Sequence, residues 1–391
     1  MRVSIAITAA ALAASAGGAV AGDEASAPLN DATRLMLRTD AASRSFEIES
    51  SPFTPIINGY VEFRYDLNHT KGGTMTSEDL TTGFSLPRSR IKVTGNIHER
   101  ARYEIEGQFS SSDGSFVVLD AYGAFEIADG TELWLGQFVA PYLREFTLAP
   151  WNQLGAERSA MNRVFTVGRT QGVMLARTTD RWRTRVSFND GANTRNTDFT
   201  STAEADLALT GRLEYLGSGA WSQFADFSSF RGSDRAWMLG LAGHWQDGGE
   251  TALTPDASLT GVTADFSVEG DGFNAFAALA WQRTDSAAGD FDDLGVLVQG
   301  GVFVTDIVEL FARYDVILAD DDRTADSDFH TLTAGLNWYL IPESQAAKVT
   351  LDVQYFLDAE ASSPITPSTG VGLLGSTDEQ VNVRLQISMV F

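Results

Sequence analysis

Apolar and polar residues alternate from Val381 to Met389, and the last residue, Phe391, keeps the apolar parity. One parity holds Val381, Val383, Leu385, Ile387, Met389 and Phe391, and the other holds Asn382, Arg384, Gln386 and Ser388. Successive side chains of a strand point to opposite faces, so this pattern predicts a strand with one apolar and one polar face. Such strands are typical of barrels that cross an outer membrane, where the apolar face meets lipid and the polar face lines the lumen.

The same alternation recurs along the chain in about sixteen segments of roughly ten residues. The segments are 56–68, 84–97, 101–111, 116–127, 131–139, 168–178, 181–190, 206–216, 234–246, 257–268, 272–283, 291–303, 306–318, 328–340, 347–358 and 379–391. Most connections alternate between tight turns and longer loops, as in membrane barrels, although 217–233 is too long for the tight set. We predict one all-β, antiparallel transmembrane barrel of about 16 strands, with both termini in the periplasm.

Two predicted strands carry aromatic residues eight positions apart on their apolar face. Trp237 and Trp245 form one such pair, and Phe273 and Trp281 form the other. Eight residues span about 26 Å along a strand, or roughly 19 Å of membrane height at a tilt of 45°. This spacing is typical of two aromatic girdles around an apolar band. The alternative is the core of a soluble β-sandwich that contains these tryptophans.

The N-terminus has the features of a secretory leader. Arg2 precedes a short apolar run at 3–14, and small residues follow at 19–21. The pattern predicts a signal peptide over 1–21. We expect a periplasmic or lumenal leader at 22–54 and the barrel at 55–391. These features predict the outer membrane of a Gram-negative-type bacterium, with lipid and lipopolysaccharide as neighbours, and Phe391 resembles the terminal signal that the barrel assembly machinery reads.

The composition restricts the partners and the chemistry. The formal net charge is −24, and this acidity argues against nucleic acid as a partner. The chain has no Cys, which excludes disulfides and thiolate metal sites. Its four His lie in different segments without metal-ligand spacing, and no G-x-S-x-G motif occurs, so we expect no metal site, no cofactor and no catalytic activity.

Basic residues cluster on the predicted lumen face of two strands. Arg88, Arg90 and Lys92 share one parity in 84–97, and Arg181, Arg183 and Arg185 share one parity in 181–190. Same-face neighbours lie about 6.6–7 Å apart, so each set forms a ladder along the wall. Guanidinium groups stay charged and bind oxyanions through two hydrogen bonds, so we expect these residues to contact permeating anions. The alternative is that they pair with the lumenal carboxylates Glu62, Glu104 and Glu106.

The connection 140–167 is too long for an ordinary loop. It contains Arg144, Arg158 and Arg163 together with several aromatic residues. A loop of this composition needs a surface to pack on, and in a wide barrel that surface is the lumen. We therefore expect this third loop to fold inward and to narrow the pore. The alternative is an external loop that covers the rim or a neighbouring protomer.

Four stretches resemble the phosphate-selective porin O and P family of outer-membrane channels. They are Asn58-Gly59-Tyr60-Val61, Arg88-Ser89-Arg90-Ile91, Gly136-Gln137-Phe138-Val139-Ala140-Pro141 and Gly168-Arg169-Thr170-Gln171-Gly172-Val173. Together with the terminal strand, the resemblance covers roughly 55–391. It implies a 16-stranded barrel that forms trimers, with an inward third loop and an arginine ladder that leads to a constriction at or near Arg144, Arg158 and Arg163. Phosphate-selective members also carry a lysine cluster, whereas this chain has only Lys71, Lys92 and Lys348.

These observations favour an outer-membrane porin with a passive, water-filled channel for small inorganic anions, and phosphate is one candidate. The alternatives are a non-selective diffusion porin, an outer-membrane enzyme or a purely structural barrel.

Overall fold

The computed structural model describes the backbone of residues 34–40 and 43–49, and the whole of residues 55–70, 80–248, 257–287, 289–322, 328–357, 372–374 and 380–391. The chain divides into a unit at Met1–Arg34 and a unit at Leu35–Phe391. The predicted signal peptide lies outside the described residues, and so does much of the predicted leader. Within the leader, β1 (Arg34–Asp40) is followed by β2 (Ser43–Glu49), and β2 pairs with the next strand through Phe46↔Ile57 and Glu47↔Ile56.

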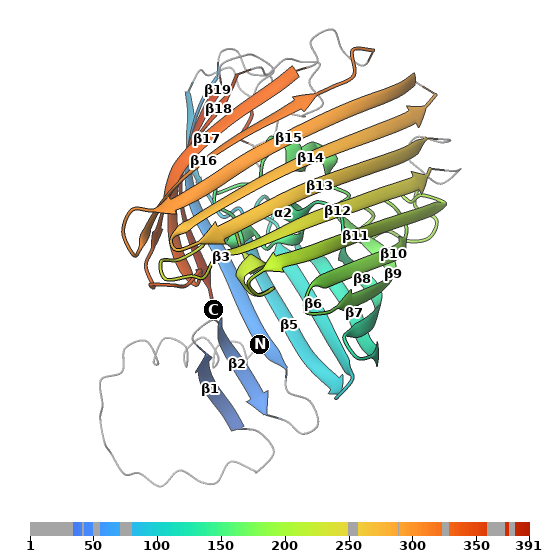
Figure 1. Cartoon of the computed structure of the whole chain (residues 1–391), viewed down its shortest axis with the longest axis horizontal. Helices are drawn as coiled ribbons and strands as arrows, with labels where there is room; N and C mark the ends of the chain where they lie inside the picture. Colours follow the sequence, from blue (N-terminus) through green and yellow to red (C-terminus); the bar gives the residue numbers. More distant parts are fainter. Residues whose placement is uncertain are drawn as a thin grey trace. The chain divides into compact units, whose positions relative to one another are not determined.

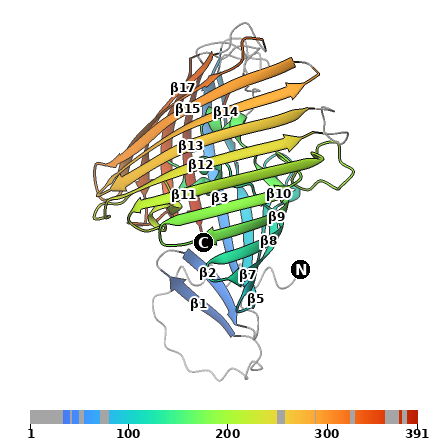
Figure 2. The ribbon, with the colours of Figure 1, turned by 45° about the vertical axis from the view of Figure 1, so that its right-hand side comes forward.

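The remaining strands run side by side and pair antiparallel with their neighbours (Figures 1 and 2). They are β3 (Ile56–His69), β4 (Leu80–Ser85), β5 (Ser89–His98), β6 (Ala101–Phe109), β7 (Phe116–Ala128), β8 (Thr131–Val139), β9 (Arg169–Thr178), β10 (Trp182–Asn189), β11 (Leu207–Ser218), β12 (Ala236–Asp247), β13 (Ser258–Gly270), β14 (Phe273–Ser286), β15 (Gly289–Phe303), β16 (Val308–Leu318), β17 (Asp328–Tyr339), β18 (Ala347–Phe356) and β19 (Gln380–Val390).

Strands β4 and β5 form one barrel strand that is interrupted at 86–88. Both pair with β3, through Arg64↔Ser85 and Val61↔Ser89, so three residues oppose two at the break. Pro87 lies in this bulge, where its missing N–H costs no ladder hydrogen bond. Counted in this way, the described residues form a closed barrel of 16 antiparallel strands, which confirms the predicted fold.

The barrel closes by pairing β19 with β3, from Val381↔His69 to Val390↔Tyr60. The backbone of Phe391 continues this ladder with two hydrogen bonds to Gly59, of 2.6 and 2.9 Å. A Cβ at Gly59 would lie 2.2 Å from the Phe391 ring. Glycine therefore makes room at this position for the terminal aromatic side chain.

The outer face of the strands is apolar, but the inner face has two different parts. Inner positions of β3–β10 are mainly polar, as the alternation predicts. Inner positions of β14–β18 are mixed, and the apolar ones, which include Phe276, Ala278, Leu297, Phe311 and Phe356, belong to one buried cluster. Apolar side chains on an inner wall are unsuited to contact with a water-filled lumen, so something must cover them.

The segment between β8 and β9, residues 140–168, covers these apolar inner residues. It contains α2 (Arg144–Thr147), the 3-10 turn η1 (Pro150–Asn152) and α3 (Ala160–Phe165), and α3 packs against β14, β15 and β16. The Ser159 hydroxyl caps α3 by accepting a hydrogen bond from the N–H of Asn162. Leu154, Met161 and Phe165 are fully buried in the resulting apolar cluster. None of the helices in the described residues is long and apolar enough to span a membrane.

Candidate permeation path

A cavity of about 810 Å³ lies between segment 140–168 and the strands β3–β7. Its lining contains seven arginines against two carboxylates, Asp66 and Glu157. The arginines are Arg64, Arg88, Arg90, Arg158, Arg163, Arg169 and Arg195. A smaller cavity of about 360 Å³ lies at the end of the barrel that carries the tight turns, where residues of β5–β9 and of two turns line it. Both cavities lie along the polar wall.

The first predicted ladder is paired with carboxylates. Its ion pairs are Arg88 with Glu62 (2.8 Å) and Glu157 (2.5 Å), Arg90 with Glu106 (2.9 Å), and Lys92 with Glu104 (2.6 Å). Each cation therefore has a counter-charge at contact distance, as in the alternative interpretation of the sequence. Alternating charges of this kind give the wall a strong local field but little net charge.

The three residues of the second predicted ladder have different surroundings. Arg181 donates hydrogen bonds to the backbone carbonyls of Leu216 and Gly217, so it stabilises a turn. Arg183 lies 3.4 Å from Glu214, and its guanidinium stacks 4.3 Å from the ring centroid of Trp221. Arg185 is half-buried and has neither a hydrogen-bond partner nor an ion-pair partner among the described residues.

The loop arginines divide into two kinds. Arg158 and Arg163 line the larger cavity, whereas Arg144 does not. Arg144 is buried, and it donates to the Ser267 hydroxyl at 3.1 Å and to the Phe224 carbonyl at 2.8 Å. Its place depends on residues more than seventy positions away, which sequence spacing cannot show.

Arg158 contributes an uncompensated charge to the larger cavity. Its guanidinium donates to the carbonyl oxygens of Glu145 and Leu148 at 2.9 and 2.5 Å, and no carboxylate of the described residues lies within ion-pair distance of it. Burial, together with the nearby charge of Arg88, lowers the pKa of Arg158 to about 9. The group still carries its proton at neutral pH, so it adds a positive charge to the lining of the cavity.

Glu157 fixes the segment to the barrel wall. Its carboxylate receives the guanidinium of Arg64 at 2.6 Å and that of Arg88 at 2.5 Å. Burial opposes its ionisation, but these two charges hold the pKa of Glu157 below its usual range. The segment also receives hydrogen bonds in its middle, where Lys348 donates to the carbonyl oxygens of Trp151 and Gln153 at 3.0 and 2.8 Å.

Two arginines of the larger cavity, Arg169 and Arg195, were not predicted from the sequence as site residues. Arg169 begins β9 and pairs with Asp120 at 2.7 Å. Arg195 is exposed in the loop after β10 and has no ion-pair partner among the described residues. Arg169 lies in one of the four stretches that resemble the family, and this position could have indicated its place at the site. Arg195 lies in a loop without periodicity, so no face could be assigned to it.

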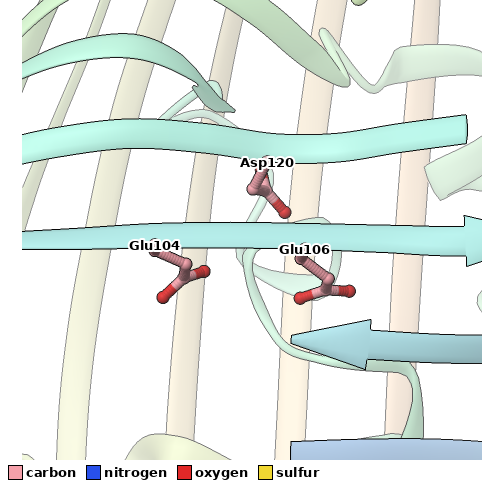
Figure 3. A group of neighbouring side chains, drawn as sticks. All are labelled: Glu104, Glu106 and Asp120. Carbon is pink, nitrogen blue, oxygen red and sulfur yellow. The ribbon is translucent and has the colours of Figure 1, made fainter. Parts of the chain in front are cut away.

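Three carboxylates lie close together on the polar wall, as Figure 3 shows. One oxygen from each of Glu104, Glu106 and Asp120 lies within 4.8 Å of the others. The register places Glu106 opposite Asp120. Each carboxylate already has a basic partner, namely Lys92, Arg90 and Arg169 respectively. Because these partners neutralise the cluster, we interpret it as the acidic side of the paired ladder.

The sequence of residues 57–287, more than half of the chain, matches the family described as phosphate-selective porin O and P. The protein belongs to this family. None of the curated proteins matches its sequence.

Solved porin structures share its fold. An anion-selective porin from Comamonas acidovorans gives a TM-score of 0.59 at 14% identity, over 87% of this chain and 100% of that one. OmpF of Salmonella typhi in complex with daunomycin gives 0.59 at 12% identity, over 88% and 100%. Outer-membrane OmpT of Vibrio cholerae gives 0.57 at 12% identity, over 88% and 100%. Family and fold together identify a channel-forming porin of a Gram-negative outer membrane.

Proposed function

We propose that this porin is a passive channel for small inorganic anions. The observation that carries the proposal is the larger cavity, where seven arginines face two carboxylates. Arg158, Arg163 and Arg195 in this lining have no carboxylate of the described residues within ion-pair distance. Anions that enter the cavity therefore meet a net positive wall despite the formal net charge of −24 on the chain.

We infer that segment 140–168 is an inward-folded constriction loop. It is bonded to inward-facing residues of strands far apart in the barrel, through Glu157 to Arg64 of β3 at 2.6 Å and through Arg144 to Ser267 of β13 at 3.1 Å. Only a segment within the lumen can reach both. In this position the loop brings Arg158 and Arg163 opposite the ladder of β5, where they face each passing ion.

Chloride and phosphate are both candidates for the permeating anion. Guanidinium groups offer two parallel donors to an oxyanion, which favours phosphate over chloride at a contact. Lys92 is already paired with Glu104, and Lys348 is bonded to backbone carbonyls, so neither is available to reproduce a lysine cluster for phosphate. We therefore propose a preference for small anions in general, with no catalytic role and no cofactor.

We also propose that the protein works as a homotrimer in contact with outer-membrane lipid and lipopolysaccharide. OmpT of Vibrio cholerae has been solved in a trimer form. The outer wall of β14 offers the small residues Ala275 and Ala277 beside Leu279, which permit close contact between protomers. Phe391, bonded to Gly59 at the closing seam, is the proposed contact of the barrel assembly machinery.

The reversal potential across a planar bilayer tests the anion preference. Purified protein is measured in a KCl gradient, and the measurement is repeated with potassium phosphate. We expect a potential whose sign shows that chloride is more permeant than potassium, and the same sign in phosphate. A potential of the opposite sign in KCl refutes the proposed selectivity, and a barrel without conductance refutes the channel.

A further inference from the structure

The connection between β11 and β12 is much longer than the other turns at its end of the barrel. It spans 219–235 and contains the 3-10 turn η2 (Gln223–Ala225). The tight turns 99–100, 129–130 and 271–272 lie at the same end, which is the periplasmic end by the usual topology of such barrels. A connection of this length is long enough to fold back into the lumen.

This segment meets the loop that comes from the opposite end. The N–H of Phe227 donates to the carbonyl of Asn152 at 3.1 Å, and the Asn152 amide donates to the carbonyl of Ala225 at 2.9 Å. Arg144 lies over the rings of Phe224 and Phe227, with its guanidinium carbon 5.7 and 5.6 Å from their centroids. Two connections from opposite ends of the barrel thus form one continuous packed unit.

The same segment reaches across to the inner wall of β14, β16 and β17. The Phe227 ring packs 4.8 Å from the ring of Phe276. The Ser228 hydroxyl lies 2.6 Å from the hydroxyl of Tyr339 and 3.3 Å from Glu309. Phe224 and Phe227 are only 3% and 4% exposed, so their rings are almost fully removed from water. Burial of two aromatic side chains holds the segment in place.

We propose that segment 219–235 is a second inward plug that closes the β12–β18 side of the lumen from the periplasmic end. Neither cavity of the candidate path is lined by a residue of β11–β18. The apolar cluster under segment 140–168 includes Phe227 and fills that side. The pore is therefore eccentric, and ions are confined to the wall that carries the ladders. This inference rests on the proposed function only for the positive charge of the remaining path, whereas the position of segment 219–235 is independent of it.

Trp221 marks the boundary between the plug and the open path. Its indole N–H donates to the carbonyl of Thr179 at 2.8 Å, and its ring stacks on the guanidinium of Arg183. A cation held on an aromatic face loses rotamer freedom. The plug thus also orients one arginine of the second ladder at the periplasmic exit.

The test uses single-cysteine variants, because the chain has no native Cys. Ala278→Cys places a thiol on the inner face of β14, two residues from Phe276, whose ring packs against Phe227, and Arg185→Cys places one on the open wall. The probe is a negatively charged methanethiosulfonate that forms a disulfide with accessible thiols. We expect Arg185→Cys to be labelled with loss of current and Ala278→Cys to stay unlabelled. Labelling of both at similar rates overturns the proposal.

A second arm removes the plug itself. We expect Phe224→Ala/Phe227→Ala to raise single-channel conductance about two-fold, because the ion-accessible cross-section widens. The same change should make Ala278→Cys reactive. The matched control is Phe199→Ala, at an aromatic residue that is 89% exposed in the loop after β10, and it should change neither readout. Unchanged conductance together with an unreactive Ala278→Cys in the double variant also overturns the plug.

The two proposals fail separately. If the pore prefers cations but the labelling pattern is as expected, the plug stands and the proposed anion selectivity falls. If both thiols react in an anion-selective pore, the plug falls and the proposed function stands. Variants that lose heat-modifiable migration on gels have not folded and are excluded. The labelling of Ala278→Cys in the otherwise native barrel then decides whether the plug is present.

Discussion

Replacing Arg185 by Gln isolates the contribution of one unpaired charge on the pore wall. Arg185 lies on the inner face of β10, and its cross-strand neighbour Ala176 lines the periplasmic cavity. Because the guanidinium makes no hydrogen bond or ion pair with the described residues, its removal breaks no contact that holds the barrel together. The change therefore alters the potential of the path while the fold stays intact.

The expected effect follows from Coulomb's law with screening. At about 5 Å in water, two unit charges interact by about 0.8 kcal/mol, and a Debye length of about 8 Å at physiological salt halves this value. The charge attracts chloride and repels potassium by similar amounts, so the permeability ratio changes by about 0.9 kcal/mol, or about four-fold. We predict that Arg185→Gln lowers the chloride-to-potassium permeability ratio by this factor.

The assay is the reversal potential in a KCl gradient, with two control variants. Arg177→Gln removes an arginine of β9 that shares the outward parity of Leu175, and it should leave the ratio unchanged. Lys92→Gln/Glu104→Gln removes a whole ion pair of the first ladder, 2.6 Å apart, without a change in net charge. We expect only a small change from that pair. An unaltered ratio in Arg185→Gln, or an equal drop in Arg177→Gln, refutes the reasoning.

Three further predictions concern stability, pH and assembly. Glu157→Gln leaves Arg64 and Arg88 without their shared carboxylate, and loss of a buried ion-pair partner costs about 3–5 kcal/mol. The temperature at which the barrel unfolds, measured by heat-modifiable migration on gels, should therefore fall. An unchanged unfolding temperature contradicts this role. Burial raises the pKa of Asp226, in the plug, to about 7, and it faces Lys348, Glu309, Glu269 and Arg144. Because its folded pKa is raised, the neutral carboxyl stabilises the plug fully below about pH 4, the ordinary pKa of Asp, and this stabilisation is lost as the pH rises towards 7, so conductance should increase over this range and Asp226→Asn should abolish the increase. Gly59→Ala should impair assembly into the outer membrane because the new Cβ meets Phe391, whereas Gly83→Ala, with no atom within 4 Å, should be tolerated.

The barrel could be predicted because the environment of its side chains alternates regularly along each strand. Each strand must show one face to lipid and one to the interior, so alternation placed most strand ends within about two residues of those in the structure. The same parity placed Arg88, Arg90 and Lys92 on one face with Glu62, Glu104 and Glu106 as potential partners. Residues related by strand geometry are therefore readable from the sequence.

The interior of the lumen could not be predicted, because it depends on non-periodic segments. The contact of Glu157 with Arg64 joins positions 93 residues apart, and that of Asn152 with Phe227 joins two loops. One signal was present in β14, where Phe276, Ala278 and Ala280 make the inner face almost as apolar as the outer one. A strand that is apolar on both faces indicates that protein rather than water covers its inner side.

The position of the charges explains how an acidic chain can offer a basic path. At the rim, Arg283 is surrounded by Asp285, Asp290 and Asp292 at 2.7 to 3.2 Å, and more carboxylates follow in exposed loops. Charges at the rim are separated from the periplasmic part of the path by more than a Debye length, so salt screens them. Inside the barrel the carboxylates Glu104, Glu106 and Asp120 are each paired, whereas Arg158, Arg163, Arg185 and Arg195 are not. In the proposed function, confinement by the two inward segments brings each ion close to these four groups, and we expect the local excess of positive charge, not the global charge, to decide selectivity.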